Sequence, residues 1–473
     1  MKMVSTMRGI LSGRFRLSRS TGFGIFLFLL LIIPSSGHAA AGPDLTIFFS
    51  SDTRGMIRRC GCTDGQLGGL SARASYIKSH RNKETLVLDA GDTLFDGLDD
   101  PRDRKAFYSL KASVLFKAMK ISGYDAILPG EYDLEFGLKF LKKEAAEMDS
   151  RLICANLDTA SGPAFPGSMI KKVGRITVGI TGVVDDKFPY ATFPSIYSKD
   201  KVTNALIAAR REVRALRKKT DVVVALAHLD VSDQEDFARK SGADVVIFGD
   251  DGGMLKKPLK YGDTIVVNGF YEGKLIGRLD LWLGKGSKKI KSYKYKAIRL
   301  GEDILPDPDV EELLAQYRQE LKEKKFAFTD MTGLKGYFAG PDMCRKCHAR
   351  SFHNWSSTKH ARAFSALVKT GDQYDPECLP CHVTGYGYPT GYGDKTKGGR
   401  PDLKNVTCED CHGAGGLHYN YEIPGNYLNP YNVPSGHVKE KVCTRCHDDY
   451  RSPNFDFKKY KQMGGAHRGN NGP

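Results

Sequence analysis

Short apolar runs alternate with amphipathic segments from residue 44 to about residue 300. Runs such as Leu45–Ser50 and Asp221–Ala227 are continuously apolar and predict buried strands, whereas Arg104–Ile121 repeats its apolar positions at helical spacing. Further strands are expected at Thr85–Leu88, Asp125–Leu128, Arg151–Ala155, Val173–Val184 (a strand pair) and Ala243–Phe248, and further helices at Gly68–His80, Leu134–Met148, Ala205–Lys218 and Ser232–Ser241. This alternation predicts a layered α/β sandwich.

The end of this region is expected to leave the alternating pattern. Three runs predict an antiparallel meander: Thr264–Asn268, Lys274–Leu283 and Lys289–Leu300. Pro308–Lys324 then predicts a charged helix that closes a domain spanning residues 42–326, called the N-terminal domain below. A Gly-containing linker is expected at residues 327–342, followed by a C-terminal region at residues 343–468 and a disordered tail at residues 469–473.

The C-terminal region has little periodicity but holds four copies of the pattern C-x-x-C-H. The copies are Cys344, Cys347 and His348; Cys378, Cys381 and His382; Cys408, Cys411 and His412; and Cys443, Cys446 and His447. In this pattern two thiols bond one edge of a porphyrin and the next imidazole binds its iron. A zinc knuckle or a redox dithiol uses C-x-x-C but does not need the adjacent histidine. The sequence therefore predicts four covalently bound c-type haems, which would also supply the core of this region.

The remaining histidines of the C-terminal region predict second axial ligands. Nine of the 12 histidines lie beyond residue 341, and five of these are outside the four motifs: His353, His360, His418, His437 and His467. This enrichment favours haem irons with two imidazole ligands, although any one of the five can instead be a surface residue. His353 follows His348 too closely to reach the opposite face of the same haem.

The N-terminus has the composition of a signal peptide. Residues 1–41 carry five basic and no acidic residues before an apolar run at Gly22–Ile33, and small residues follow, so that cleavage is expected between Ala39 and Ala41. The run is short for a membrane span, and an uncleaved anchor is the alternative. We therefore expect an exported protein, periplasmic in a bacterium, without a stable membrane anchor, which agrees with haem attachment outside the cytoplasm.

The net charge of +16 does not indicate nucleic-acid binding. The signal peptide supplies +5 of it, and the basic residues of the remainder form no long block. The propionates of four haems would also offset the charge of the C-terminal region. A solvated basic surface is the better interpretation, with redox proteins rather than nucleic acid as the expected partners.

Polar residues follow the predicted strands of the N-terminal domain. They are Asp52, Asp92, Glu131, His228 and Asp250. Ligand sites of open α/β folds lie beyond the carboxyl ends of strands, and converging carboxylates and imidazoles bind hard or borderline cations. The sequence predicts a metal site here, although polar residues are common at strand ends without one.

Residues 44–300 resemble the metallophosphoesterase superfamily, in particular its 5′-nucleotidase branch. The matching positions are Asp52, the Gly91-Asp92 pair and His228. The positions that depart from the family's usual ligands or catalytic histidine are Arg54, Glu131, Tyr132, Asp250 and Gly252. The resemblance implies an α-β-β-α sandwich, and the departures imply that the two-metal hydrolase is lost while Asp52, Asp92 and His228 can still hold one divalent metal. An active hydrolase of phosphate or sulfur esters is the rival interpretation.

Residues 343–468 resemble the tetrahaem cytochrome c family that accepts electrons from hydroxylamine oxidoreductase in nitrifying bacteria. The resemblance lies in the four haem motifs, in Trp355 with Ser357-Thr-Lys-His360-Ala, and in the Gly that follows His412. It implies that His360, His418 and His467 are distal ligands and that the haem on Cys378 and Cys381 has an open side, which His437 could fill. The expected function is electron transfer between partners, with the N-terminal domain as a docking module. A haem oxidoreductase acting on a small nitrogen or sulfur compound is a second rival.

Three cysteines lie outside the haem motifs. Cys60 and Cys62 flank a single glycine, which is too close for a relaxed disulfide between them. One of them could bond Cys154, or both could be soft metal ligands beside the predicted site. The sequence leaves both alternatives open.

Overall fold

The computed structural model of the chain describes residues 42–60, 66–97, 104–146, 151–188, 201–249, 255–284, 289–326, 337–393, 399–416, 438–448, 451–452 and 454–462. Residues 43–473 form one compact unit. Within these ranges, no helix combines the length with the apolar character that crossing a membrane requires. The expected signal peptide at residues 1–41 lies outside the described residues.

The first sheet of the N-terminal domain has five strands in the order β16-β15-β1-β4-β5. Its strands are β1 (Leu45–Ser50), β4 (Thr85–Asp89), β5 (Ala126–Ile127), β15 (Leu275–Leu283) and β16 (Ile290–Arg299). Strand β1 runs parallel to β4 and antiparallel to β15, and all six of its residues are buried. Because β1 and β4 are parallel, the loops that follow them leave from the same edge of the sheet.

The second sheet has six strands in the order β13-β14-β12-β11-β9-β8. Its strands are β8 (Ser168–Val173), β9 (Ile176–Val184), β11 (Val222–His228), β12 (Val245–Gly249), β13 (Leu259–Tyr261) and β14 (Thr264–Asn268). Strand β11 is buried on both faces. Val222, Val224 and Leu226 join the larger apolar core, whereas the alternate residues Val223 and Ala225 join a second, smaller core. This period of two places β11 between two layers.

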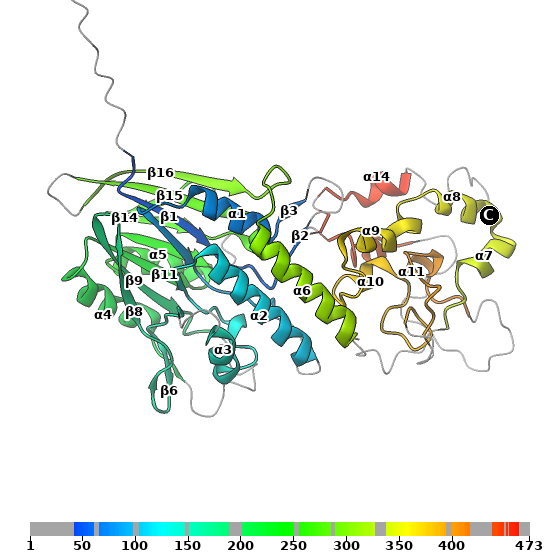
Figure 1. Ribbon diagram of the computed structural model, residues 1–473, viewed down its shortest axis with the longest axis horizontal. Helices are drawn as coiled ribbons and strands as arrows, with labels where there is room; N and C mark the ends of the chain where they lie inside the picture. The colour runs from blue at the N-terminus through cyan, green and yellow to red at the C-terminus, as the bar shows by residue number, and fades with distance from the viewer. Residues whose placement is uncertain are drawn as a thin grey trace, which may run out of the picture. The chain divides into compact units, whose positions relative to one another are not determined.

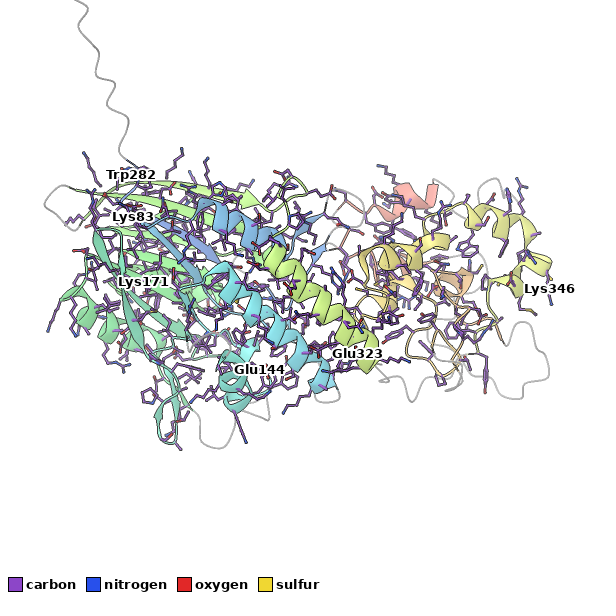
Figure 2. All side chains as sticks on the ribbon, viewed as in Figure 1. Lys83, Glu144, Lys171, Trp282, Glu323 and Lys346 are labelled. Carbon is purple, nitrogen blue, oxygen red and sulfur yellow. The ribbon has the colours of Figure 1, made fainter. Side chains whose placement is uncertain are left out.

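Helices cover the outer faces of both sheets (Figure 1). The helices α1 (Leu70–His80), α2 (Lys105–Ser122), α3 (Leu138–Ala145) and α6 (Pro308–Lys324) share the larger core with β1 and β4. The helices α4 (Ala205–Arg217) and α5 (Val231–Lys240) share the smaller core with β11, β12 and β14. Charged residues such as Lys83 and Glu323, both labelled in Figure 2, are exposed on the surface. The predicted α-β-β-α sandwich is therefore confirmed.

The expected antiparallel meander is wrong for its first member. Strand β14 runs parallel to β12 in the six-stranded sheet and pairs antiparallel with β13. Strands β15 and β16 form the antiparallel hairpin that the sequence predicted, but in the five-stranded sheet. The chain thus crosses from one sheet to the other between Asn268 and Leu275, through the 3-10 turn η5 (Tyr271–Gly273).

Glycines move several predicted boundaries. Helix α1 begins at Leu70 because Gly68 and Gly69 have positive φ angles of 87° and 85°, and β3 (Leu67–Gly68) pairs there with β2 (Arg59–Cys60). The helix expected from Leu134 is shorter and follows the 3-10 turn η2 (Tyr132–Leu134).

The predicted strand Arg151–Ala155 forms only one bridge, between Leu152 and Ile127. A small sheet of β6 (Leu157–Thr159), β7 (Gly162–Pro163) and β10 (Lys201–Val202) was not predicted.

The C-terminal region consists of short helices. They are α7 (Pro341–Cys347), α8 (Ala349–Ser356), η6 (His360–Arg362), α9 (Ala363–Thr370), α10 (Leu379–His382), α11 (Cys408–His412), α13 (Glu440–Cys443) and α14 (Phe457–Gln462). The apolar core among its described residues is small, with Leu367, Leu379 and Val383 as its buried members. So small an apolar core agrees with the expectation that cofactors fill this region.

Candidate metal centre and haem-binding region

The predicted metal site forms where the carboxyl edges of the two sheets meet. Asp52 follows β1, Asp92 follows β4, and His228 is the last residue of β11. Their ligand atoms all lie within 4.8 Å of one another, and all three residues are buried. The His228 Nε2 atom lies 3.6 Å from Asp52 Oδ1 and 3.6 Å from Asp92 Oδ2, which is too far for a hydrogen bond. One imidazole and two carboxylates facing a common point are suitable ligands for a single divalent cation.

The backbone around this centre is strained. Among the described residues, six other than glycine have positive φ angles, and four of them surround the site: Asp52, Arg54, Asp92 and Glu272. Such conformations cost free energy and concentrate at functional sites. Gly130 is required for close packing, because a Cβ atom at this position would lie 2.1 Å from Asp92 Oδ1.

Glu131 orients His228 and does not join the three converging ligands. One oxygen of Glu131 accepts a hydrogen bond of 2.9 Å from the Asp185 N–H, and the other lies against His228 Nδ1. This contact directs Nε2 of the imidazole toward Asp52 and Asp92, as carboxylates do behind metal-binding histidines. Glu131, which was expected to converge with the metal ligands, instead contacts the histidine of the site from behind.

Burial and charge together define the electrostatics of the centre. Burial disfavours the imidazolium form, but Glu131 and Asp92 outweigh it and raise the pKa of His228 well above its usual value. Burial also raises the pKa of Asp92 well above its usual value, which Glu131 reinforces and His228 opposes. The buried carboxylates thus repel one another, and a bound cation would relieve that repulsion.

Arg54 places a fixed positive charge beside the centre. Its Nη2 atom lies 3.4 Å from Asp52 Oδ1, and its guanidinium lies over the rings of Tyr271 at 4.6 Å and Tyr132 at 5.4 Å from their centroids. Burial opposes its charge, but Asp92 and Asp52 outweigh this effect and raise the pKa of Arg54. The guanidinium therefore neutralises part of the carboxylate charge that a second metal ion would need.

Two of the four predicted haem-ligating histidines have the hydrogen bonds of metal ligands. The Nδ1 of His382 donates to the Ala363 carbonyl oxygen at 2.7 Å, since a carbonyl can only accept. The Nδ1 of His447 is 3.0 Å from the Ser452 hydroxyl. Such bonds fix the ring and leave Nε2 available for iron, as is usual for metal-binding histidines.

The imidazole rings of His360 and His447 lie close together in the C-terminal region, tilted by 50° to each other. Their ring centroids are 6.0 Å apart. Imidazole nitrogens bind transition metals at about 2 Å, so two rings on opposite sides of one iron have centroids about 6 Å apart. At this separation both imidazoles could hold the iron of one haem, which would be the haem attached to Cys443 and Cys446.

The haem motifs lie close to one another. The Cys344 thiol contacts the Cys408 thiol, and the Cys381 thiol contacts the Cys446 thiol. The contact with Cys446 lowers the pKa of Cys381 to about 7. The first motif therefore adjoins the third, and the second adjoins the fourth. Arg445 of the fourth motif also donates a hydrogen bond of 2.8 Å to the Asp410 carbonyl oxygen of the third.

The comparisons with known proteins divide along the same boundary. A family model described as cytochrome c554 and c-prime matches residues 343–413. Cytochrome c-554 of Nitrosomonas europaea is 33% identical over 93 residues, which are 16% of this chain and 39% of that protein. An apyrase of Aedes albopictus is 26% identical over 283 residues, which are 52% of this chain and 48% of the apyrase.

Solved structures give the same fold for the N-terminal domain. The structure of the sulfate thiohydrolase SoxB from Thermus thermophilus superposes with a TM-score of 0.53 at 17% identity, over 61% of this chain and 62% of that one. The chain is a fusion of a metallophosphoesterase-like domain and a cytochrome c554-like region. We call residues 42–326 the phosphoesterase-like domain and residues 343–468 the cytochrome region. The chain covers less than half of the apyrase and of the cytochrome, so the activities in their names are not transferred as findings.

Several predicted residues of the fusion lie outside the described residues. They are His418, His437, His467, Asp250, Gly252 and Cys62. Cys154 is described, and it carries a free, buried thiol 3.4 Å from Asn156 Oδ1, so the suggested disulfide to Cys60 or Cys62 is wrong. Burial raises the pKa of Cys154 to about 12, which makes it a structural thiol.

Three residues that contact the ligands or Arg54 at the phosphoesterase-like site were not predicted from the sequence. The Ser51 hydroxyl donates to Asp52 Oδ2 at 2.5 Å, and the Glu272 N–H donates to the Asp52 carbonyl oxygen at 2.5 Å. Tyr271 supplies one of the rings beside Arg54. Of the three, only Ser51 could have been identified from the sequence, because it is a polar residue directly after a buried strand. Tyr271 and Glu272 lie in the crossing between sheets that the predicted meander obscured.

Proposed function

We propose that this protein is an exported tetrahaem c-type cytochrome that carries electrons between redox partner proteins. The proposal rests on the neighbouring imidazoles of His360 and His447, because two imidazole ligands close a haem iron to small ligands and suit it to electron transfer. The haems would supply one-electron chemistry, and the chain's residues would attach, orient and enclose them.

The arrangement of the motifs supports electron movement within the region. The thiols of the second and fourth motifs contact each other, as do those of the first and third. Haems bonded to adjacent cysteines would lie near one another. His382 and His447, whose rings are fixed by Ala363 and Ser452, would bind the irons of the second and fourth haems.

The compartment and the partners follow from the N-terminus and from the cofactors. The basic and apolar pattern of residues 1–41 supports export to a periplasm or another exterior, where c-type haems are attached. Redox proteins are the proposed partners, and nucleic acid is not, because the basic residues form no block.

For the phosphoesterase-like domain we propose one divalent cation held by Asp52, Asp92 and His228. A two-metal hydrolase needs both cations about 3.5–4 Å apart to hold the attacking and leaving oxygens. Here the Arg54 guanidinium lies 3.4 Å from Asp52, and Glu131 is engaged by His228 and Asp185. Two-metal hydrolysis is therefore lost, and the domain serves as a docking or ligand-binding module.

The haem stoichiometry tests the proposal. Protein matured with the haem-attachment machinery should show four haem additions by intact mass spectrometry, one for each motif. The double variant Cys443→Ala, Cys446→Ala should show three. A parent protein with three or fewer additions would contradict the tetrahaem assignment.

A further inference from the structure

An acidic segment directly precedes the second haem motif. Asp372, Asp375 and Glu377 lie within six residues of Cys378. Backbone hydrogen bonds from the Cys378 N–H and the Leu379 N–H to the Asp375 carbonyl oxygen, at 3.1 and 3.2 Å, join this segment to the motif. The Asp375 side chain also accepts from the Glu377 N–H at 2.8 Å. These carboxylates are therefore held in place beside the attachment point of one haem.

Arg58 of the phosphoesterase-like domain pairs with two of these carboxylates. Its guanidinium contacts both Asp372 and Asp375, and the Asp375 side chain is fully buried. The Arg58 side chain is 20% exposed. A charge in such a position is screened less by salt and solvent than a surface charge is.

Two further cations of the phosphoesterase-like domain reach the same segment. Lys111 on α2 lies 2.6 Å from the Glu377 carboxylate, and its side chain is 6% exposed. Arg318 on α6 lies 3.4 Å from Asp372. The cytochrome region supplies the acids and the phosphoesterase-like domain supplies the bases.

The positive charge of Arg58 acts on the cysteine of the second motif. Burial raises the pKa of the Cys378 thiol, and Arg58 is the strongest influence that opposes this rise. A charge that favours a thiolate at this atom also favours an added electron on a haem bonded to it, because both changes add negative charge.

We propose that the phosphoesterase-like domain sets the reduction potential of the haem on Cys378 and Cys381 through the charges of Arg58 and Lys111. The domain thereby has a redox role that needs no catalysis of its own. Arg58 lies six residues after Asp52, in the segment that follows β1, so one segment carries a metal ligand and a cation of the interface. This inference rests on the proposed attachment of haem to the second motif.

A potentiometric titration of the full-length haem protein tests the proposal. Arg58→Gln removes the cation that pairs with both Asp372 and Asp375 and leaves Arg318 as a partner of Asp372 alone, so one of the four one-electron transitions should move to lower potential. We expect a change of roughly tenfold in the reduced-to-oxidised ratio of that haem at fixed potential, which is about 59 mV for one electron. The other three transitions should stay where they are.

Matched variants separate charge from packing. Arg58→Lys keeps the charge and should stay near the parent potential. Arg175→Gln makes the same change at an ion pair with Asp44, just before β1, and should leave all four transitions unchanged. Lys111→Gln should lower the potential of the same transition as Arg58→Gln does. If Arg58→Gln does not fold, Lys111→Gln can be used in its place.

The outcomes are distinguishable. If Arg58→Gln or Lys111→Gln retains four haems by intact mass and titrates like the parent, the proposal is overturned. An equal shift in Arg175→Gln would also overturn it, since the effect would then be one of net charge. A parent protein without haem on Cys378 and Cys381 would instead refute the proposed function on which this inference rests.

Discussion

His360 and His447 are far apart in the sequence of the cytochrome region, yet the centroids of their rings lie 6.0 Å apart. The motif predicted the role of His447, because the residue after C-x-x-C binds the iron of its own haem. The role of His360 came from a family resemblance alone. The structure places the ring of His360 beside that of His447, the histidine of the fourth motif.

His360→Ala should change the spin state of one haem. Removing the imidazole opens one axial position, so that iron should become high-spin or bind water, while all four haems stay attached through their thioethers. Electron paramagnetic resonance of the oxidised protein would report the change. His353→Ala is the matched control, because His353 is exposed and lies on α8 next to its own motif. An unchanged number of low-spin haems in His360→Ala would assign the ligand role elsewhere.

The residues of the metal centre were predictable to different degrees. Asp52, Asp92 and His228 follow buried strands, and this position alone predicted that they meet. The role of Glu131 was not predictable, because the same strand-end position suits a ligand and a residue that orients one. Its contacts with His228 and Asp185 decide the matter.

At the scale of elements, continuous apolar runs predicted most central strands of the two sheets, because strands such as β1, β4, β11 and β12 are buried along their whole length. The sequence could not assign each strand to a sheet. Strand β14 and strand β15 are neighbours in the chain but belong to different sheets, and both are apolar enough to be buried in either. Short elements such as β13 and the β6-β7-β10 sheet lack a pattern long enough to detect.

The edge where the sheets meet should bind one cation and hydrolyse nucleotides poorly or not at all. Only three ligand groups converge there among the described residues, and the Arg54 guanidinium lies 3.4 Å from the Asp52 carboxylate. Dialysis against Mn²⁺ followed by metal analysis should give one equivalent per chain, and Asp92→Ala should reduce it. Robust phosphate release from a nucleotide with Mn²⁺ or Zn²⁺, abolished by Asp92→Ala, would contradict the loss of hydrolysis.

At the scale of the whole molecule, the boundary between the two parts follows from the source of their cores. The phosphoesterase-like domain buries a large apolar cluster, and its hydrophobic pattern therefore predicted its architecture. The cytochrome region buries few apolar side chains among its described residues, so its pattern predicted little beyond the motifs themselves. The ion pairs of Arg58 and Lys111 with the acids before Cys378 were not predictable either, because their partners are far apart in the chain.

A reductive titration under anaerobic conditions would test directly whether the chain is a tetrahaem electron carrier. The optical spectrum would be followed while reductant is added in known amounts, and reoxidation would be followed in the same way. Each chain should take up four electrons and return them reversibly, and the double variant Cys443→Ala, Cys446→Ala should take up three. Uptake of fewer than four electrons by the parent chain, or failure to return them, would contradict a tetrahaem electron carrier.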